Sequence, residues 1–215
     1  MEIHAASDRS LLVVFGNEIS LEAHRHVLWL VRAFEKLPAG ILNVHPAYAS
    51  VLIDFDPRLR SHDAVEALVR EASPQEAAAR DTRTIEIPVC YGGAFGPDLE
   101  DVARHTGLTA ARVVELHAAA PYLVYFLGFS PGFPYLGGLP PELATPRLSA
   151  PRKVVPAGSV AIGGSQTGVY TVDSPGGWRI IGRTALRLFD PAATPPALLR
   201  IGDTVRFVPT PETRL

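Results

Sequence analysis

Residues 121–191 constrain the fold of this chain more than any other stretch of it. Glycine and proline recur every few residues there, and they separate short apolar runs at 123–127, 160–162, 180–181 and 186–189. Gly and Pro set tight turns, so this pattern is typical of many short strands joined by turns. Such strands close most readily into a small barrel, because closure removes the unpaired strand edges that promote aggregation.

The composition indicates a soluble globular protein. The 215 residues are 47% hydrophobic, which is enough for packed cores in one large domain or two small ones. A net charge of -2 offers no basic surface, so we expect no nucleic-acid partner. The N-terminus, MEIHAASDRS, does not resemble a signal peptide, and no apolar run approaches the ~20 residues that cross a bilayer. We therefore expect a cytoplasmic protein without membrane contact.

Cysteine and histidine usage argues against a disulfide or a metal site. Cys90 is the only cysteine, so no internal disulfide forms, and its apolar surroundings in IEIPVCYGG favour a buried hydrophobe over a reactive thiol. Apart from His117, the histidines show no spacing typical of metal ligands, and we expect no metal site.

The first part of the chain combines strand and helix patterns. Short apolar runs predict strands at 10–15, 41–45, 50–55 and 84–89. Ser20 is a good N-cap for a helix whose apolar repeat continues until Pro38, and Ser61 opens a second helix.

These elements give the order βαββαβ, which is typical of a ferredoxin-like domain, and we assign it to residues 1–83. A second interpretation stays open, because the polar segment 71–83 reads equally as a linker, in which case strand 84–89 opens the next domain.

Two further helices are expected at 98–105 and 109–119, leading into the barrel. The fold class is therefore α+β, with a second domain at residues 84–215.

Three motifs give the chain a family resemblance. The segments GFSPGFPYLGGLP (128–140), PRKVVPAGSVAIGGSQTGVY (151–170) and SPGGWRIIGRT (174–184) are similar, in this order, to the signature of the KipI / allophanate hydrolase subunit 1 family, the family of carboxyltransferase subdomains C and D. Thr171 stands where that signature usually has proline. The resemblance implies a cyclophilin-like β-barrel for the second domain.

The resemblance also implies an activity. It implies the B subunit of an ATP-dependent 5-oxoprolinase, which converts 5-oxo-L-proline, ATP and water to L-glutamate, ADP and phosphate. The implied partners are a KipA/PxpC-like protein with a related barrel, which is the C subunit, and a PxpA/LamB-YcsF-like protein, which is the A subunit. ATP is the implied co-substrate of the complex. The ATP site is not located, because Gly168 of the loop GGSQTG is followed by Val169 and not by the lysine of a Walker A motif.

Two other functions stay open. KipI inhibits a histidine kinase, so the resemblance also allows a regulatory role with such a kinase as partner, although no segment marks a docking surface. Similar modules form the carboxyltransferase part of urea carboxylase, which implies carboxyl transfer or allophanate metabolism.

Three residues are candidate catalytic groups. His117 is expected at the carbonyl end of a helix, where a cation is favoured, and the resemblance also places a histidine here; its alternative role is a hydrogen bond to a helix-terminal carbonyl. Arg152 and Arg183 stand among apolar strand residues, where an arginine needs an anionic partner. Each either clamps an anionic substrate or forms an ion pair with Asp173 or Asp190.

The candidates for substrate binding are Phe129, Tyr135, Gln166, Tyr170 and Ser174. Phe129 and Tyr135 lie among glycines and prolines, so loop packing places their rings either at a cleft or in the core. Gln166 and Tyr170 add polar groups to a glycine-rich loop that forms a hairpin turn or cradles an oxyanion. Ser174 lacks the GxSxG context of a nucleophile and offers only a hydroxyl.

Overall fold

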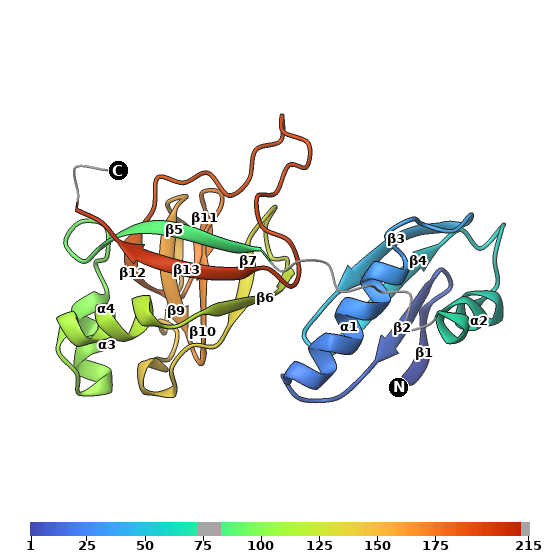
Figure 1. The fold of residues 1–215 in the computed structure, drawn as a ribbon, viewed down its shortest axis with the longest axis horizontal. Coiled ribbons are helices and arrows are strands. Elements are labelled where there is room, and N and C mark those ends of the chain that lie inside the picture. The colour runs from blue at the N-terminus through green and yellow to red at the C-terminus, as the bar shows by residue number, and fades with distance from the viewer. Residues whose placement is uncertain (73–82, 212–215) are drawn as a thin grey trace. The chain divides into compact units, whose positions relative to one another are not determined.

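The computed structural model describes residues 1–72 and 83–211, which belong to two compact units, Met1–Asp81 and Thr82–Leu215 (Figure 1). Of the segment 71–83, for which the sequence allows a linker, residues 73–82 lie outside the described residues. Within the described part, no helix has both the length and the apolar character that crossing a membrane requires.

Within residues 1–72, four strands form an antiparallel sheet in the order β1-β2-β4-β3. The elements of this unit are β1 (Glu2–Ser7), β2 (Ser10–Val14), α1 (Leu21–Ala33), β3 (Ile41–Pro46), β4 (Ser50–Phe55) and α2 (His62–Glu71). Ser20 caps α1 as predicted, its Oγ accepting the Ala23 N–H at 3.0 Å. Both helices bury apolar side chains against the sheet, among them Val27 of α1 and Val65 of α2.

The order βαββαβ predicted for this unit is not confirmed. β1 precedes the first predicted strand, and the segment 84–89 lies in β5 (Thr84–Tyr91) of the other unit, so the described order is ββαββα. β1 was missed because its side chains are nearly all exposed and EIHAAS shows no apolar alternation. The pattern TIEIPV does form a strand, but a local pattern does not identify the strand's partner, which is β13 (Thr204–Pro209). Of the two interpretations of 84–89, the strand that opens the next unit is the correct one.

In the described part of the second unit, seven strands close into a barrel in the order β10-β7-β6-β13-β5-β12-β9, which confirms the barrel predicted from residues 121–191. Besides β5 and β13, the barrel strands are β6 (Tyr122–Leu127), β7 (Pro134–Gly137), β9 (Ser159–Gly163), β10 (Gln166–Val169) and β12 (Arg179–Arg183). A separate two-stranded sheet pairs β8 (Arg152–Val155) with β11 (Ser174–Gly176). The closed barrel is consistent with the cyclophilin-like barrel that the resemblance implies.

The two helices predicted before the barrel are confirmed as α3 (Leu99–Thr106) and α4 (Ala110–Ala119), and a short 3-10 helix, η1 (Pro141–Leu143), follows β7. Thr109 caps α4, its Oγ1 accepting the Arg112 N–H at 3.2 Å.

The glycine-rich loop 163–168 is a hairpin, as one of its two interpretations predicted. β9 and β10 pair across it, with Gly163 opposite Gln166. Gly163 also lies under an indole ring, since a Cβ added there would be 2.5 Å from Trp178 Cδ2. Glycine is therefore required at Gly163 for close packing.

The first and last strands close the barrel. β13 pairs in parallel with β5 and antiparallel with β6. Just before β5, Arg83 forms an ion pair with Asp203, which precedes β13, and donates from Nη2 to the Leu198 carbonyl at 3.0 Å. These contacts join the two ends of the unit.

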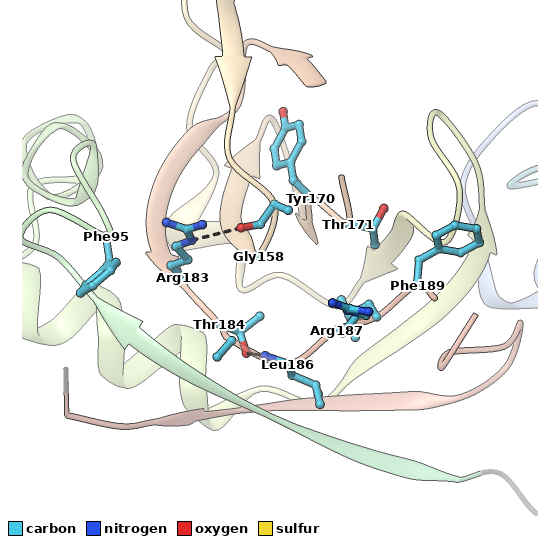
Figure 2. Close-up of a pocket in the computed structure, with 12 residues that line it drawn as sticks. Phe95, Gly158, Tyr170, Thr171, Arg183, Thr184, Leu186, Arg187 and Phe189 are labelled. Atoms are coloured by element: carbon cyan, nitrogen blue, oxygen red, sulfur yellow. Dashed lines mark hydrogen bonds between the residues drawn. The ribbon is translucent and has the colours of Figure 1, made fainter. Parts of the chain in front are cut away.

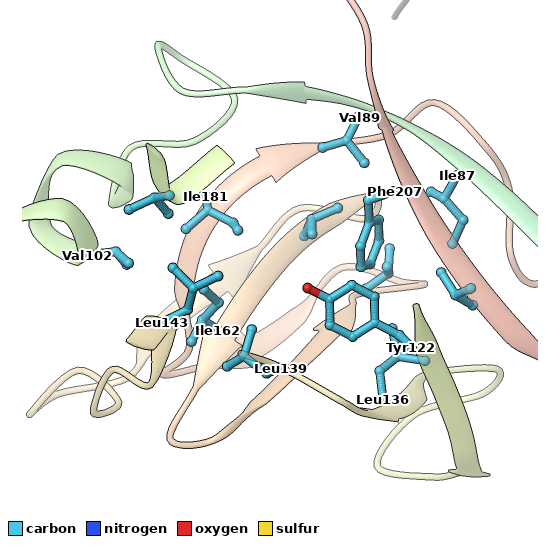
Figure 3. Packing of buried hydrophobic residues seen from close by; sticks show 14 of the residues in the cluster. Ile87, Val89, Val102, Tyr122, Leu136, Leu139, Leu143, Ile162, Ile181 and Phe207 are labelled. Atoms are coloured by element: carbon cyan, nitrogen blue, oxygen red, sulfur yellow. The ribbon is translucent and has the colours of Figure 1, made fainter. Parts of the chain in front are cut away.

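The barrel interior is a packed core (Figure 3). Tyr122 and Phe207 lie with ring centroids 5.2 Å apart, surrounded by fully buried aliphatic side chains such as Leu136, Ile162 and Ile181. Burial of each such side chain contributes about 1.5–3 kcal/mol, so this core is a major source of stability.

Candidate functional site

A cavity of about 460 Å³ opens in the second unit (Figure 2). Its walls come from the turn before β9, from the residues after β10, from the last residue of β12 and from the segment 184–189 that follows it. Phe95 and Phe189 lie at opposite ends of it. A volume of this size is typical of small-molecule sites, and we call it the arginine cavity after the side chains described next.

Arg183 and Arg187 line this cavity, and no Asp or Glu among the described residues does. The Nε of Arg183 donates to the Ala157 carbonyl at 3.1 Å, which orients the guanidinium, and within residues 1–72 and 83–211 this side chain has no ion-pair partner. Arg187 is 74% exposed and lies 3.6 Å from Asp190. Because guanidinium groups bind carboxylates and phosphates and the lining carries no acid, the arginine cavity suits an anion.

Closely packed backbone forms part of the cavity wall. The Gly158 N–H donates to the Tyr170 carbonyl at 2.7 Å, and its own carbonyl accepts the Thr184 N–H at 2.9 Å. Gly158 has a φ of +83°, and an added Cβ would lie 2.2 Å from the Thr184 oxygen. Only glycine allows this approach, so the wall is held by main-chain contacts on both sides.

A second, smaller cavity of about 110 Å³ lies beside the first, and Tyr170 lines both. We call it the aromatic hollow, and its lining residues are Phe129, Phe133, Tyr135, Arg147, Tyr170, Gly176, Gly177 and Trp178. Three of the predicted binding residues, Phe129, Tyr135 and Tyr170, therefore meet at one place. The interpretation of these rings as cleft-lining fits this arrangement, although Phe133 itself is buried.

Tyr170 is only 2% exposed. Burial raises the pKa of its hydroxyl, while a hydrogen bond from the Trp178 backbone and the positive charges of Arg147 and Arg152 act in the opposite direction. The hydroxyl is therefore protonated at neutral pH.

His117 lies in the barrel core and lines neither cavity. Its Nε2 is 2.9 Å from Thr167 Oγ1, and that hydroxyl donates to the Ala161 carbonyl at 3.0 Å, so Nε2 carries the proton and donates. Nδ1 then accepts from the Tyr91 hydroxyl at 2.8 Å. Burial lowers the pKa of His117 to about 3, so the ring is neutral, which fits its structural interpretation, although with side-chain partners in place of a helix-terminal carbonyl.

Arg152 is held by an ion pair. Its Nη2 donates to Asp98 Oδ1 at 2.7 Å, and Asp98 Oδ2 accepts the Ile180 N–H at 2.7 Å. The sequence offered two roles for Arg152, a clamp on an anionic substrate or an ion pair with Asp173 or Asp190. It forms an ion pair, but neither of the two named partners is the correct one. Asp173 instead accepts the Ala157 N–H at 2.7 Å.

Gln166 and Ser174 line neither cavity. Gln166 opens β10 at the hairpin, and Ser174 opens β11, with its Oγ buried and without a hydrogen-bond partner among the described residues. Of the eight predicted site residues, the structure thus brings Arg183 and Tyr170 to the arginine cavity and Phe129, Tyr135 and Tyr170 to the aromatic hollow.

Sequence reasoning missed several residues of these cavities, chiefly Phe95, Arg147, Thr184, Arg187 and Phe189. A signal existed for Arg187, because the segment GRTALRLF repeats an arginine directly after the last motif. Arg147 stands in a polar loop and has no local sign of its role.

A closed barrel with a cavity lined by two arginines, preceded in the chain by a small sheet with two helices, defines a protein of mixed α and β structure. In the part of the chain that the structure describes, no group of three or more His, Cys, Asp or Glu is placed to hold a metal ion. The family model for the carboxyltransferase domain, subdomain C and D, matches residues 1–199, and the chain belongs to this family.

Curated relatives share most of the chain. It is 49% identical over 195 residues to the B subunit of 5-oxoprolinase from Escherichia coli O157:H7, covering 90% of this chain and 89% of the relative. It is 41% identical over 224 residues to the B subunit of 5-oxoprolinase from Bacillus subtilis, covering 96% of this chain and 92% of the relative.

Solved structures agree on the fold. The crystal structure of TTHA0988 matches with a TM-score of 0.88 at 39% identity, covering 96% of this chain and 41% of that chain, so the present chain spans about two fifths of it. The uncharacterized protein PH0987 of Pyrococcus horikoshii matches with a TM-score of 0.60 at 49% identity over 99% of both chains. The K. lactis urea amidolyase shares the fold, with a TM-score of 0.79 at 22% identity, over 99% of this chain and 15% of that chain.

Proposed function

We propose that this chain is the B subunit of an ATP-dependent 5-oxoprolinase, which works with the A and C subunits to convert 5-oxo-L-proline, ATP and water to L-glutamate, ADP and phosphate. The observation that carries the proposal is 49% and 41% identity, over most of the chain, to two proteins that are named as this component of 5-oxoprolinase. We place the complex in the cytoplasm, where ATP is available.

The arginine cavity supports a contributing role for the chain within such a complex. Arginines and hydroxyl groups line it, but no histidine, cysteine or carboxylate of the described residues does. Hydrolysis of a lactam requires loss of amide resonance, and ATP makes this feasible by phosphorylating the amide oxygen. Arg183 and Arg187 provide the positive charge that stabilises such oxygens, while His117 and Arg152 maintain the fold around them.

The test is release of glutamate and phosphate from 5-oxo-L-proline and ATP by this chain alone, by the two partner proteins without it, and by all three together. We expect turnover only in the complete set. Absence of glutamate from a complete set that is folded and assembled overturns the proposal.

Within the active set, Arg183→Ala is expected to lower kcat/KM by about a hundredfold, the usual effect of losing one oriented donor to developing charge. Arg112→Ala is the matched control, because Arg112 is exposed and its one ion pair within the described residues is with Glu115, across one turn of α4. Equal activity of the two variants removes Arg183 from the site.

A second candidate function is carboxyl transfer. It is favoured by 27% identity to the urea amidolyase of Lachancea kluyveri, which covers 98% of this chain and 13% of the relative. Transfer of a labelled carboxyl group from carboxybiotin to urea by the assembled set, without glutamate release, favours this candidate over the first.

A further inference from the structure

The aromatic hollow differs from the arginine cavity in size and in chemistry. Its volume of about 110 Å³ contrasts with about 460 Å³ for the larger cavity. Drug-sized ligands occupy about 300–1,000 Å³, so the hollow admits one small ring and excludes a nucleotide.

The wall of the hollow is built from interlocked rings. Phe133 packs edge to face against three others, those of Tyr135, Tyr170 and Trp178, at centroid distances of 5.3, 5.4 and 5.7 Å. Rings that pack on one another in this way have fixed positions. The hollow therefore offers a preformed apolar surface to the face of a small ring.

The Tyr170 hydroxyl supplies a polar group at this wall. It lies against Gly176, where an added Cβ would be 2.3 Å from the hydroxyl oxygen. The hydroxyl oxygen receives a hydrogen bond from the Trp178 backbone, so its own proton is available to an acceptor such as a carbonyl oxygen.

Arg147 supplies a cation at the same place. Its guanidinium lies 5.7 Å from the centroid of the Trp178 ring, and it lines the hollow. No ion pair of Arg147 is present within the described residues 1–72 and 83–211, so its planar fork is oriented by the indole and remains open to a carboxylate.

Phe129 forms the rim of the hollow in a strained conformation. Its φ is +64°, in the left-handed region that a bulky residue rarely adopts. The residue is 61% exposed to solvent. The ring nevertheless keeps an edge-to-face contact with Phe133 at 5.4 Å. Strain of this kind persists where the surrounding structure holds it, often at ligand sites.

From these four features we propose that the aromatic hollow is a binding site for a small cyclic carboxylate, with the ring on the aromatic wall, a carbonyl on the Tyr170 hydroxyl and the carboxylate on Arg147. Resting on the proposed function, the ligand is 5-oxo-L-proline, a five-membered lactam that carries one carboxylate. The arginine cavity is then left for the other anionic groups of the reaction.

Trp178 allows direct observation of this site. The chain has two tryptophans, so Trp29→Phe leaves Trp178 as the single emitter. Titration of this 215-residue variant with 5-oxo-L-proline is expected to change its emission in a saturable way. Arg147→Ala should weaken the apparent Kd by about tenfold or more, the usual effect of losing a charged hydrogen bond, whereas Arg112→Ala should not. The lactam 2-pyrrolidinone, which lacks the carboxylate, should bind weakly to Arg147→Ala and to Arg112→Ala, with the same apparent Kd for the two variants.

Kinetics of the reconstituted set separate this inference from the proposed function. Arg147→Ala is expected to raise KM for 5-oxo-L-proline by about tenfold or more and to leave KM for ATP unchanged, with Arg147→Lys intermediate because it keeps the charge but not the planar fork. Unchanged KM in Arg147→Ala, or an emission titration that this substitution does not affect, overturns the inference while the activity stands. If the wild-type set releases no glutamate, the proposed function fails, and the titration alone decides whether the hollow binds a cyclic carboxylate.

Discussion

The buried imidazole of His117 makes stability depend on pH. Its pKa is about 3 in the folded chain, and an unfolded histidine titrates near about 6.5, so the unfolded state takes up the proton first as the pH falls. The stability contributed by this neutral group is complete above about pH 6.5 and decreases by about 1.4 kcal/mol per pH unit down to the folded pKa. Urea unfolding at about pH 7, 6, 5 and 4 measures this slope.

His117→Gln is the matched variant for that measurement, because it keeps hydrogen-bonding groups but does not titrate. The difference in free energy of unfolding between wild type and variant should be largest at neutral pH and shrink toward acid. His24, whose pKa is lowered by burial to about 4, is present in both proteins and cancels in the difference. A constant difference across this range contradicts the expectation.

The ion pair of Arg152 and Asp98 is a second contribution of single residues to the stability of the fold. Asp98 is 5% exposed, and Asp98→Ala leaves both the guanidinium and the Ile180 N–H without their acceptor. We expect a loss of about 3 kcal/mol in the free energy of unfolding. Asp101→Ala, which removes a 41% exposed carboxylate paired with Arg104 and, at 3.4 Å, with Arg179, should cost less than about 1 kcal/mol. Equal losses in the two variants would show that burial of the pair is irrelevant.

Residue types in the motifs were enough to select Arg183 and Tyr170, which the structure places in the arginine cavity. They were not enough to assign partners. Asp98 stands 54 positions before Arg152, and its meeting with that side chain depends on how α3 and β8 are placed by the fold. Local sequence patterns cannot predict a contact between residues so far apart in the chain.

At the scale of elements, glycines mark where rings cross the barrel strands. A Cβ at Gly163 would lie 2.5 Å from Trp178, so Gly163→Ala must displace the indole that forms part of the aromatic hollow. We expect a loss of about 1–3 kcal/mol, typical of overpacking, and a changed Trp178 emission. Gly16→Ala is the control, because its nearest neighbour would be Ala23 Cβ at an ordinary 3.9 Å. Urea unfolding of both variants checks the expectation, which an unaffected Gly163→Ala contradicts.

Prediction of elements succeeded where the signal is local. The caps Ser20 and Thr109 and the glycine hairpin were recognised because capping and turn formation involve residues a few positions apart. β1 was not recognised, because an exposed edge strand shows no apolar alternation in its sequence. The unit to which β5 belongs was not recognised either, because the whole chain decides which strand it pairs with.

At the scale of the whole molecule, the second unit has its own buried core and its own closing contact between Arg83 and Asp203. We therefore expect a fragment of residues 83–215 to fold alone, with near-ultraviolet circular dichroism and cooperative unfolding. A fragment that begins after β5, at residue 92, lacks the partner of β13 and should not fold. Loss of structure in the longer fragment would contradict this expectation.

The parallel pairing of β5 with β13 also sets an order of events during protein synthesis. Thr204 pairs with Thr84 and Pro209 with Val89, so the strand that completes the barrel is synthesised well after its parallel partner β5. Units fold as they emerge, N-terminal first, and the first unit is complete long before that moment. The nascent chain thus carries a finished first unit while the barrel strands still lack their final neighbour. A chain that stops before residue 204 would therefore have a folded first unit and an open barrel.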